Sequence, residues 1–441
     1  MEIMRKKILI QIIAMLPGVS LFAQQYNIWT LDKCIEYAFV RNIQVRKKIL
    51  SNKTKVLYAD LAKAQRFPSL GASAEQNFNW SKSSAPASSG LAGSNGTSYS
   101  LNTEVTLFNY FRINNLIKQA ELDIQSGVYS LETTKESISI SILNAYLQVL
   151  YAGEHVKNSR KQIESTESQL NFAGEKLAIK GISHSDFALI KSQLAGEKLS
   201  LANSESQLAI ARVNLMQLMD LPVTPDFQIA QPDPGENINQ NRVPDVMEVY
   251  AKALAIKPQI KNAEIGKELA ALEENIEKAG YYPVLSASAG IGSSFKSIKQ
   301  DSYFTQVNDD IRPGVGLSLS IPVYQRKQVK TNVALSKLHY QSAELDELDI
   351  KNQLRKNIEQ ACQDVVSAQA EYEASMEKYN ATNESSMLSD EKFRQGLINS
   401  VDYLVQKTNL IEAESQLLQS KYNLIISYNI MDFYMGVLFT L

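Results

Sequence analysis

The residues that most often do chemistry are sparse in this chain, and their spacing fits no catalytic or metal-binding motif. His155, His184 and His339 lie at no metal-ligand spacing. Cys34 and Cys362 are too few and too far apart for a disulfide framework, so we expect two buried free thiols. Asp and Glu are abundant, but their pattern is typical of solvated helix faces. We therefore expect no enzymatic activity, no metal and no cofactor.

The first residues have the pattern of an export signal. Three basic residues at positions 5–7 precede an apolar run from Ile8 to Leu16, and cleavage is expected after Ala23. This order predicts a secretory signal peptide at residues 1–23. Its removal takes away three positive charges and one negative charge, so the net charge moves from −2 to −4. An exported and mildly acidic chain is not expected to bind nucleic acid.

Four segments of about ten residues alternate between apolar residues and small or polar ones. They predict strands at about 69–80 and 98–108, and again at about 284–295 and 314–324. Such alternation is typical of transmembrane β-strands, because one face meets lipid and the other meets water. A half-buried hairpin of a soluble protein would show the same pattern strand by strand. In the last segment, the residues predicted to face lipid are Val315, Leu317, Leu319 and Ile321.

Very long helices are predicted around these strands, because no proline occurs between residues 87 and 221 or after residue 322. Apolar residues recur in sevens from Phe111 to Ile179, which is coiled-coil spacing. At 1.5 Å per residue this segment makes a helix of roughly 105 Å. Gly181 follows this helix and Gly396 follows its counterpart, and we expect each glycine to supply a left-handed turn before a return helix. A helix that is broken once precedes each strand pair.

The same order of segments occurs twice, about 215 residues apart. Pro68, at the entry to the first strand, corresponds to Pro283, and Gly181 corresponds to Gly396. Self-similarity at a fixed spacing is typical of tandem structural repeats. The predicted divisions are a first repeat at 24–221, a proline-rich equatorial connection at 222–245 and a second repeat at 246–441.

Four strands leave two open edges, and an open edge cannot face lipid, because each unpaired backbone group there costs several kcal/mol. The chain is therefore predicted to form an oligomer. Eight strands from a dimer would leave little lumen, whereas twelve strands from a trimer would enclose a pore. The Gly, Ser, Asn and Glu residues on the inner faces favour the trimer.

Taken in this order, the features resemble the TolC-like outer-membrane efflux family. The resemblance covers nearly the whole mature chain, including the opening helix from Leu31 to Asn42, the strand entries at Pro68 and Pro283, and the glycine tips. It implies a mainly helical homotrimer in which a 12-stranded β-barrel in the outer membrane continues into a long α-helical tunnel in the periplasm. Such a protein would be a passive, gated exit duct, which docks on a periplasmic adaptor coupled to an inner-membrane pump.

The resemblance also implies roles for single residues. The family's adaptor-docking tips correspond here to Gly181, Ile182, Ser183, Gly396, Leu397 and Ile398. The narrowest part of the pore corresponds to Asp402 and Val405 on the second return helix and to Asp186 on the first. Val405 departs from an all-acidic pattern, and the first tip is expected to be one residue shorter than the second. Asp402 also fits a simpler role, as a carboxylate at a helix start, where the helix dipole favours it.

A periplasmic coiled-coil adaptor or structural tether is the alternative function, since it would also contain long heptad helices. It would not explain strands set within each repeat. Recovery in the outer membrane as an oligomer would support the duct, and a soluble periplasmic pool would support the tether.

Overall fold

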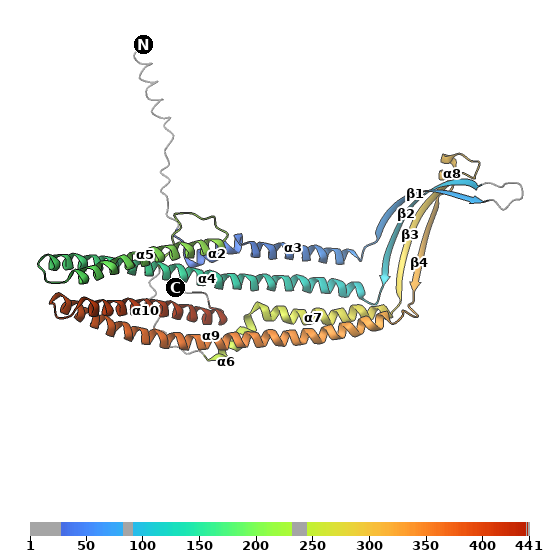
Figure 1. Cartoon of the computed structure of the whole chain (residues 1–441). Coiled ribbons are helices and arrows are strands. Elements are labelled where there is room, and N and C mark those ends of the chain that lie inside the picture. The colour runs from blue at the N-terminus through green and yellow to red at the C-terminus, as the bar shows by residue number, and fades with distance from the viewer. Residues whose placement is uncertain (1–27, 83–90, 232–244, 438, 440–441) are drawn as a thin grey trace, which may run out of the picture. The chain divides into compact units, whose positions relative to one another are not determined.

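The computed structural model describes residues 28–82, 91–231, 245–437 and 439, so the predicted signal peptide and most of the predicted connection lie outside the described residues. The same order of helices and strands occurs twice (Figure 1). The first set is α2 (Leu31–Arg41), α3 (Ile43–Ala64), β1 (Ser69–Lys82), β2 (Leu91–Phe108), α4 (Arg112–Ala178) and α5 (His184–Leu218). The second set is α6 (Val246–Ile256), α7 (Pro258–Lys278), a 3₁₀ turn (Ala279–Tyr281), β3 (Val284–Lys296), α8 (Tyr303–Asp309), β4 (Arg312–Ser320), α9 (Gln328–Arg394) and α10 (Ser400–Tyr434). The prediction of a mainly helical fold is confirmed.

The two broken helices break by different means. Between α2 and α3, the Asn42 side chain accepts a hydrogen bond from the amide of Gln44 at 2.8 Å and so caps the new helix. Between α6 and α7, Lys257 is extended because it precedes Pro258, whose ring disfavours the helical conformation of the residue before it. Proline is itself well suited to the first position of the next helix.

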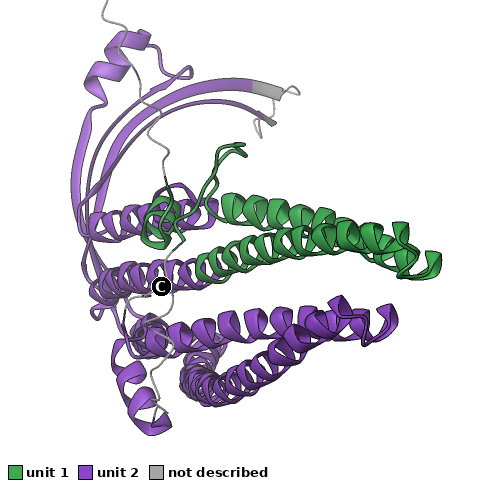
Figure 2. Ribbon diagram, turned by 90° about the vertical axis from the view of Figure 1, so that its left-hand side faces the viewer, with its two compact units in different colours: residues 1–38, 142–234, 441 green, residues 39–141, 235–440 purple. Residues whose placement is uncertain are grey.

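The chain divides into two compact units, which do not coincide with the two repeats (Figure 2). One unit comprises residues 1–38, 142–234 and 441, and the other comprises residues 39–141 and 235–440. Within the first unit, the buried Tyr146 donates a hydrogen bond from its hydroxyl to the carbonyl of Ala230 at 2.8 Å. This bond ties the segment after α5 to α4. None of the described helices is both long and apolar enough to cross a membrane.

The core of the second unit follows α9. One cluster joins α9 to α6 and α7 through Val249, Ala253, Ile260, Leu354, Ile358 and Cys362. The next joins α9 to α10 through Val365, Ala368, Leu424, Tyr428 and Met431. In Figure 1, α7 and α10 accordingly follow one another beside the single long helix α9.

One antiparallel sheet joins the strands of both repeats in the order β1-β2-β3-β4. β2 begins seven residues earlier than predicted, since its pairing with β1 continues to Leu91. Within this extension Gly93 pairs with Trp80, and a Cβ at Gly93 would lie 3.3 Å from the indole nitrogen. β4 ends at Ser320, short of the predicted 324. Its last partner, Val284, follows Pro283, which has no N–H to donate to the ladder.

Candidate functional site: a two-faced sheet and two helical tips

The pairing register brings the apolar residues of the strands onto one common face. Side chains of directly paired residues point to the same side of an antiparallel sheet, and the apolar pairs include Leu101↔Ile291, Ala287↔Leu317 and Leu285↔Leu319. Val315, Leu317 and Leu319 are 89%, 74% and 60% exposed in the single chain. Ile321, predicted to belong to the same strand, lies one residue beyond the end of β4. The alternation predicted from sequence thus gives a surface that is largely apolar, with Thr103 and Ser293 among its polar members.

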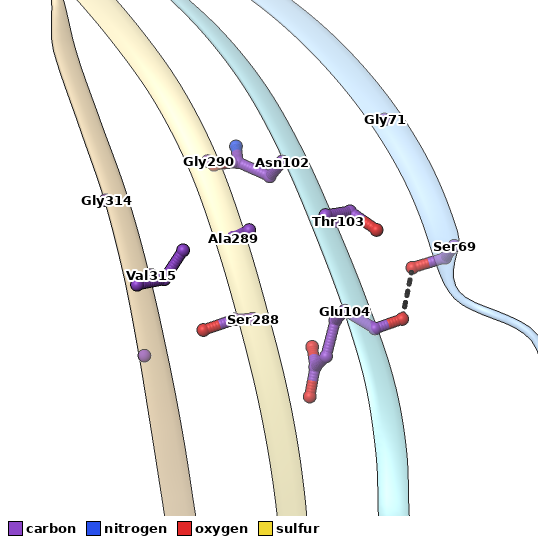
Figure 3. A pocket seen from close by; sticks show the side chains of 11 residues that line it. Ser69, Gly71, Asn102, Thr103, Glu104, Ser288, Ala289, Gly290, Gly314 and Val315 are labelled. Atoms are coloured by element: carbon purple, nitrogen blue, oxygen red, sulfur yellow. Dashed lines mark hydrogen bonds between the residues drawn. The ribbon is translucent and has the colours of Figure 1, made fainter.

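The opposite face is polar and hollowed. Figure 3 shows Asn102 and Glu104 of β2, Ser288 of β3 and Ser69 of β1 around this hollow. The Asn102 side chain lies across β3 at Gly290, where a Cβ would come within 2.6 Å of its amide oxygen. A side chain at position 290 would therefore displace Asn102. Carboxylate, amide and hydroxyl groups line most of this hollow and suit contact with water.

The second helical tip is built as predicted around Gly396. This residue has a φ of +75°, and the amide of Leu397 donates to the carbonyl of Lys392 at 2.8 Å. The Gly396 amide donates to the carbonyl of Phe393 at 3.0 Å. These two bonds form a Schellman motif, which satisfies carbonyls at the end of α9.

The first tip has the same bonds, but its left-handed residue is Lys180, at a φ of +61°. The amide of Gly181 donates to the carbonyl of Lys176 at 2.7 Å, so Gly181 holds the position of Leu397. The prediction that Gly181 supplies the left-handed turn is wrong, because Lys180 is the counterpart of Gly396, 216 residues before it. The prediction of a shorter first tip is also wrong, since residues 179–183 and 395–399 connect the helices over equal lengths.

Both aspartates predicted at the pore constriction lie in the first turn of a return helix and bond to its N-cap residue. The Ser183 hydroxyl donates to the Asp186 carboxylate at 2.7 Å and accepts from the Asp186 amide at 3.0 Å. The Asn399 side chain donates to the Asp402 carboxylate at 2.9 Å and accepts from the Asp402 amide at 2.8 Å. These contacts satisfy amides that have no partner within the helix. The structure therefore gives each aspartate a capping role. Val405, one turn further, is 51% exposed.

Apolar side chains surround the second tip. Phe393 and Tyr403 are buried and stack with ring centres 4.7 Å apart, which joins the ends of α9 and α10. Leu397, between the helices, is 69% exposed. The sequence analysis did not identify this aromatic pair, although two aromatics flanking a glycine turn were a visible signal.

Sequence analysis also missed a buried ion pair at the break between α6 and α7. Lys257 is 3% exposed, and its ammonium lies 3.1 Å from the carboxylate of Glu136 on α4 and 3.2 Å from the ring centre of Phe433 on α10. Burial lowers the pKa of Lys257 and raises the pKa of Glu136, against the attraction between them. A buried ion pair is weak evidence for net stability, although removing one partner is costly. This pair lies where α4, the α6–α7 break and α10 meet.

Tandem sets of long helices joined by one two-faced β-meander define a class of protein, the subunits of outer-membrane channels with a helical periplasmic part. The family described as "Outer membrane efflux protein" matches residues 35–220 and 249–437. The chain belongs to this family. It is accordingly a protein of the outer membrane whose helical part lies in the periplasm, as predicted.

Individual relatives agree with this assignment. The toxin and drug export protein A of Aggregatibacter actinomycetemcomitans is 22% identical over 433 residues, which cover 92% of this chain and 88% of the relative. The outer membrane protein TolC of Escherichia coli K12 is 22% identical, with 96% of this chain and 85% of the relative covered. The solved structure of the Campylobacter jejuni CmeC outer membrane channel has a TM-score of 0.77 at 14% identity, with 92% of this chain and 85% of that chain covered. These relatives are channel and export proteins, and an adaptor or tether is not favoured.

Proposed function

We propose that the protein is the passive, gated exit duct of a tripartite efflux or secretion system. The observation that supports it most directly is the pairing of the sheet. Among the described residues, β1 pairs only with β2 and β4 only with β3, so each chain has two open edges. Unpaired edges are costly in lipid, and three copies would close them into a barrel of twelve strands, wide enough to enclose water.

The two faces of the sheet set the direction in which such a barrel closes. The face with Leu101, Leu317 and Leu319 suits lipid, and the face with Asn102 and Glu104 suits a wet lumen. A duct of this kind contains no source of energy, so we infer that an inner-membrane pump drives export and that a periplasmic adaptor connects the two.

We place the adaptor contact at the two tips, at Gly181, Ile182, Ser183, Gly396, Leu397 and Ile398. The exposed Leu397 offers an apolar contact at the second tip. A photo-reactive residue at position 397, introduced in the native host, should form an adduct with an adaptor protein. The same residue at position 304, on α8 beside the sheet, should not. Adducts at position 304 alone would exclude docking at the tips.

We place the constriction at Asp402 and Val405, with Asp186 contributing from the first repeat. In a trimer Asp402 would occur three times around one axis, and a ring of carboxylates favours cations. The capping contacts would hold these carboxylates in place, so the two roles are compatible. Val405 would add an apolar ring that resists wetting.

The oligomeric state tests the duct itself. Mass measurement of the purified protein, corrected for bound detergent, should give three chains. A monomer or a dimer would contradict the closed barrel.

Two substitutions separate the pore role of Asp402 from its capping role. Asp402→Asn removes the charge but keeps the size of the side chain, and should weaken cation selectivity and block by trivalent cations in planar bilayers. Asn399→Ala disturbs the cap but keeps the charge, and should weaken selectivity less than Asp402→Asn does. Unchanged selectivity in Asp402→Asn would leave the aspartate with its capping role alone.

A further inference from the structure

The short helix α8 folds back onto the apolar face of the sheet. The Tyr303 hydroxyl lies 2.6 Å from the hydroxyl of Tyr99, and the ring centres of Tyr303 and Phe295 are 4.8 Å apart. The Ser293 hydroxyl donates to the carbonyl of Val307. Tyr99, Ser293 and Phe295 share the face of Leu101 and Ile291, because alternate residues of a strand point to the same side. In Figure 2, α8 accordingly lies on the convex side of the curved strands.

Large apolar side chains on α8 and its flanks are exposed, and one of them, Ile311, lies beside Tyr99 and Leu101 of the apolar face. Phe304 is 83% exposed, Ile298 is 75% exposed and Ile311 is 52% exposed. Each is a large apolar side chain within fifteen residues of sequence, next to the apolar face. A cluster of this kind marks a contact surface rather than an ordinary water-exposed loop.

The first strand pair has aromatic residues at the end of the sheet that lies far from the helices. Phe78 and Trp80 lie on the apolar face at the end of β1 far from the helices, with ring centres 6.5 Å apart, and they are 59% and 68% exposed. Membrane strands place aromatic rings where lipid headgroups begin. β4 begins only at Arg312 and contains no aromatic residue. The last strand, β4, therefore has no aromatic residue at this end of the sheet. The helix α8 brings Tyr303 and Phe304 to the same face.

We propose that α8 is an interfacial helix, which lies on the lipid side of the sheet with Phe304 among the headgroups and upper acyl chains of the outer leaflet. The inference rests on the proposed function, because it takes the apolar face to be the lipid face. The outer leaflet follows from topology, since α3, α4, α7 and α9 all join the opposite ends of the strands. The contact is apolar and aromatic in origin rather than ionic, because the loop has charges of both signs, at Lys296, Lys299, Arg312, Asp301, Asp309 and Asp310.

A lid across the lumen is the opposite arrangement for this helix. Such a lid would cover the polar face around Asn102 and Ser288. The contacts of α8 through Tyr303 and Val307 are with the apolar face. The chain reaches the polar side only after the helix ends, where the Ser294 hydroxyl donates to Asp310 at 2.5 Å.

Tryptophan fluorescence can test the position of α8, because the chain has only two tryptophans, Trp29 and Trp80. Three single-tryptophan proteins are compared: Trp80 alone (Trp29→Phe), Trp29 alone (Trp80→Phe), and Phe304→Trp with both native tryptophans replaced by Phe. Each is reconstituted into phosphatidylcholine vesicles brominated either near the headgroups or near the chain ends. Phe304 is 83% exposed, so the protein with this aromatic exchange should fold, and recovery of the heat-modifiable oligomer checks this.

The expected result is that tryptophan at position 304 is quenched about as strongly as Trp80, and more by shallow than by deep bromines. Trp29, on the helical part, should not be quenched. Quenching of position 304 by aqueous iodide but not by bromolipid, with Trp80 quenched by bromolipid, would overturn the placement of α8 alone. Absence of bromolipid quenching at Trp80 as well would instead contradict the proposed orientation of the sheet.

Discussion

The two repeats end their helices in the same backbone conformation but with different residues. In the second repeat, α9 and α10 are followed by glycines at positive φ, Gly396 at +75° and Gly436 at +79°. In the first repeat, the corresponding residues are Lys180 at +61° and Asp220 at +56°. A side chain in this conformation costs roughly 1 to 2 kcal/mol. The fold therefore requires a left-handed residue after each of these helices. The second repeat has glycine there, which adopts this conformation with less strain.

At the junction from strand to long helix, by contrast, the repeats agree. Tyr110 and Phe111 precede α4 with φ values of +49° and +60°, and Arg326 and Lys327 precede α9 with values of +50° and +66°. Two successive left-handed residues that are not glycine are uncommon. Because both repeats keep this pair, the change of direction between sheet and helix depends on a fixed backbone path.

The largest effect is expected from charge on the apolar face, where Leu101 and Leu317 are equivalent positions. Leu→Arg at either should cost roughly 2 to 4 kcal/mol near the middle of the membrane. Ser318→Arg, on the polar face next to Leu317, should still assemble. The measurement is the fraction of outer-membrane protein recovered as a heat-modifiable oligomer. Loss of the oligomer in only one of the two Leu→Arg variants would show that the repeats are not equivalent within the sheet.

The break between α6 and α7 differs from the break between α2 and α3, and substitutions can test that difference. Glu136→Gln leaves the ammonium of Lys257 buried without its partner and should cost roughly 3 kcal/mol. Adding Lys257→Met should recover most of this loss, because burial opposes both charges. In the first repeat, Asn42→Ala removes only a cap and should cost about 1 kcal/mol. Thermal unfolding midpoints compare the variants, and a double variant as unstable as Glu136→Gln would show that the ion pair is favourable in itself.

Substitutions at the left-handed residue of each tip should change its stability in opposite directions. Lys180→Gly should stabilise the first tip and Gly396→Ala should destabilise the second, each by roughly 1 kcal/mol, because both residues have positive φ. Hydrogen exchange of the amides at the ends of α4 and α9 measures each tip separately. Equal responses of the same sign would mean that the two tips do not share one conformation.

The smallest effect concerns the cysteines, one in each repeat. Cys34 is fully buried, and burial raises the pKa of its thiol to about 12, while burial also raises the pKa of Cys362. Both are free. At pH 8 neither should form the reactive thiolate, so a thiol reagent should label the native protein slowly and label two thiols after denaturation. Fewer than two labelled thiols under denaturing conditions would indicate a disulfide.

Long periodic elements could be predicted from sequence, and single contacts could not. α4 begins and ends within one residue of the predicted segment from Phe111 to Ile179, because heptad spacing and the absence of proline extend along its whole length. The start of β2 follows from its pairing with β1 across the sheet, where Gly93 lies opposite Trp80. The first tip was misplaced by one residue because glycine is the usual left-handed residue, and here lysine takes that conformation.

The residues of the candidate site also divide into those that the sequence predicted and those that it did not. The alternation in each strand predicted which residues share a face, and the register brings those faces together. Lys257 was missed because its burial depends on the meeting of α4, the α6–α7 break and α10. The capping contacts of Asp186 and Asp402 were foreseen only for Asp402, as a residue at a helix start.

The pairing of β2 with β3 has a consequence for the order of folding. Lys82 pairs with Leu91 across a short connection, whereas Leu101 and Ile291 pair across 189 residues of intervening chain. Because distant pairings must overcome a larger loop-closure entropy and form slowly, the hairpins should become protected in pulse-labelled hydrogen exchange before the central β2–β3 ladder does. The repeats would then cross the periplasm as separate hairpins and commit to a shared membrane surface only in a late step.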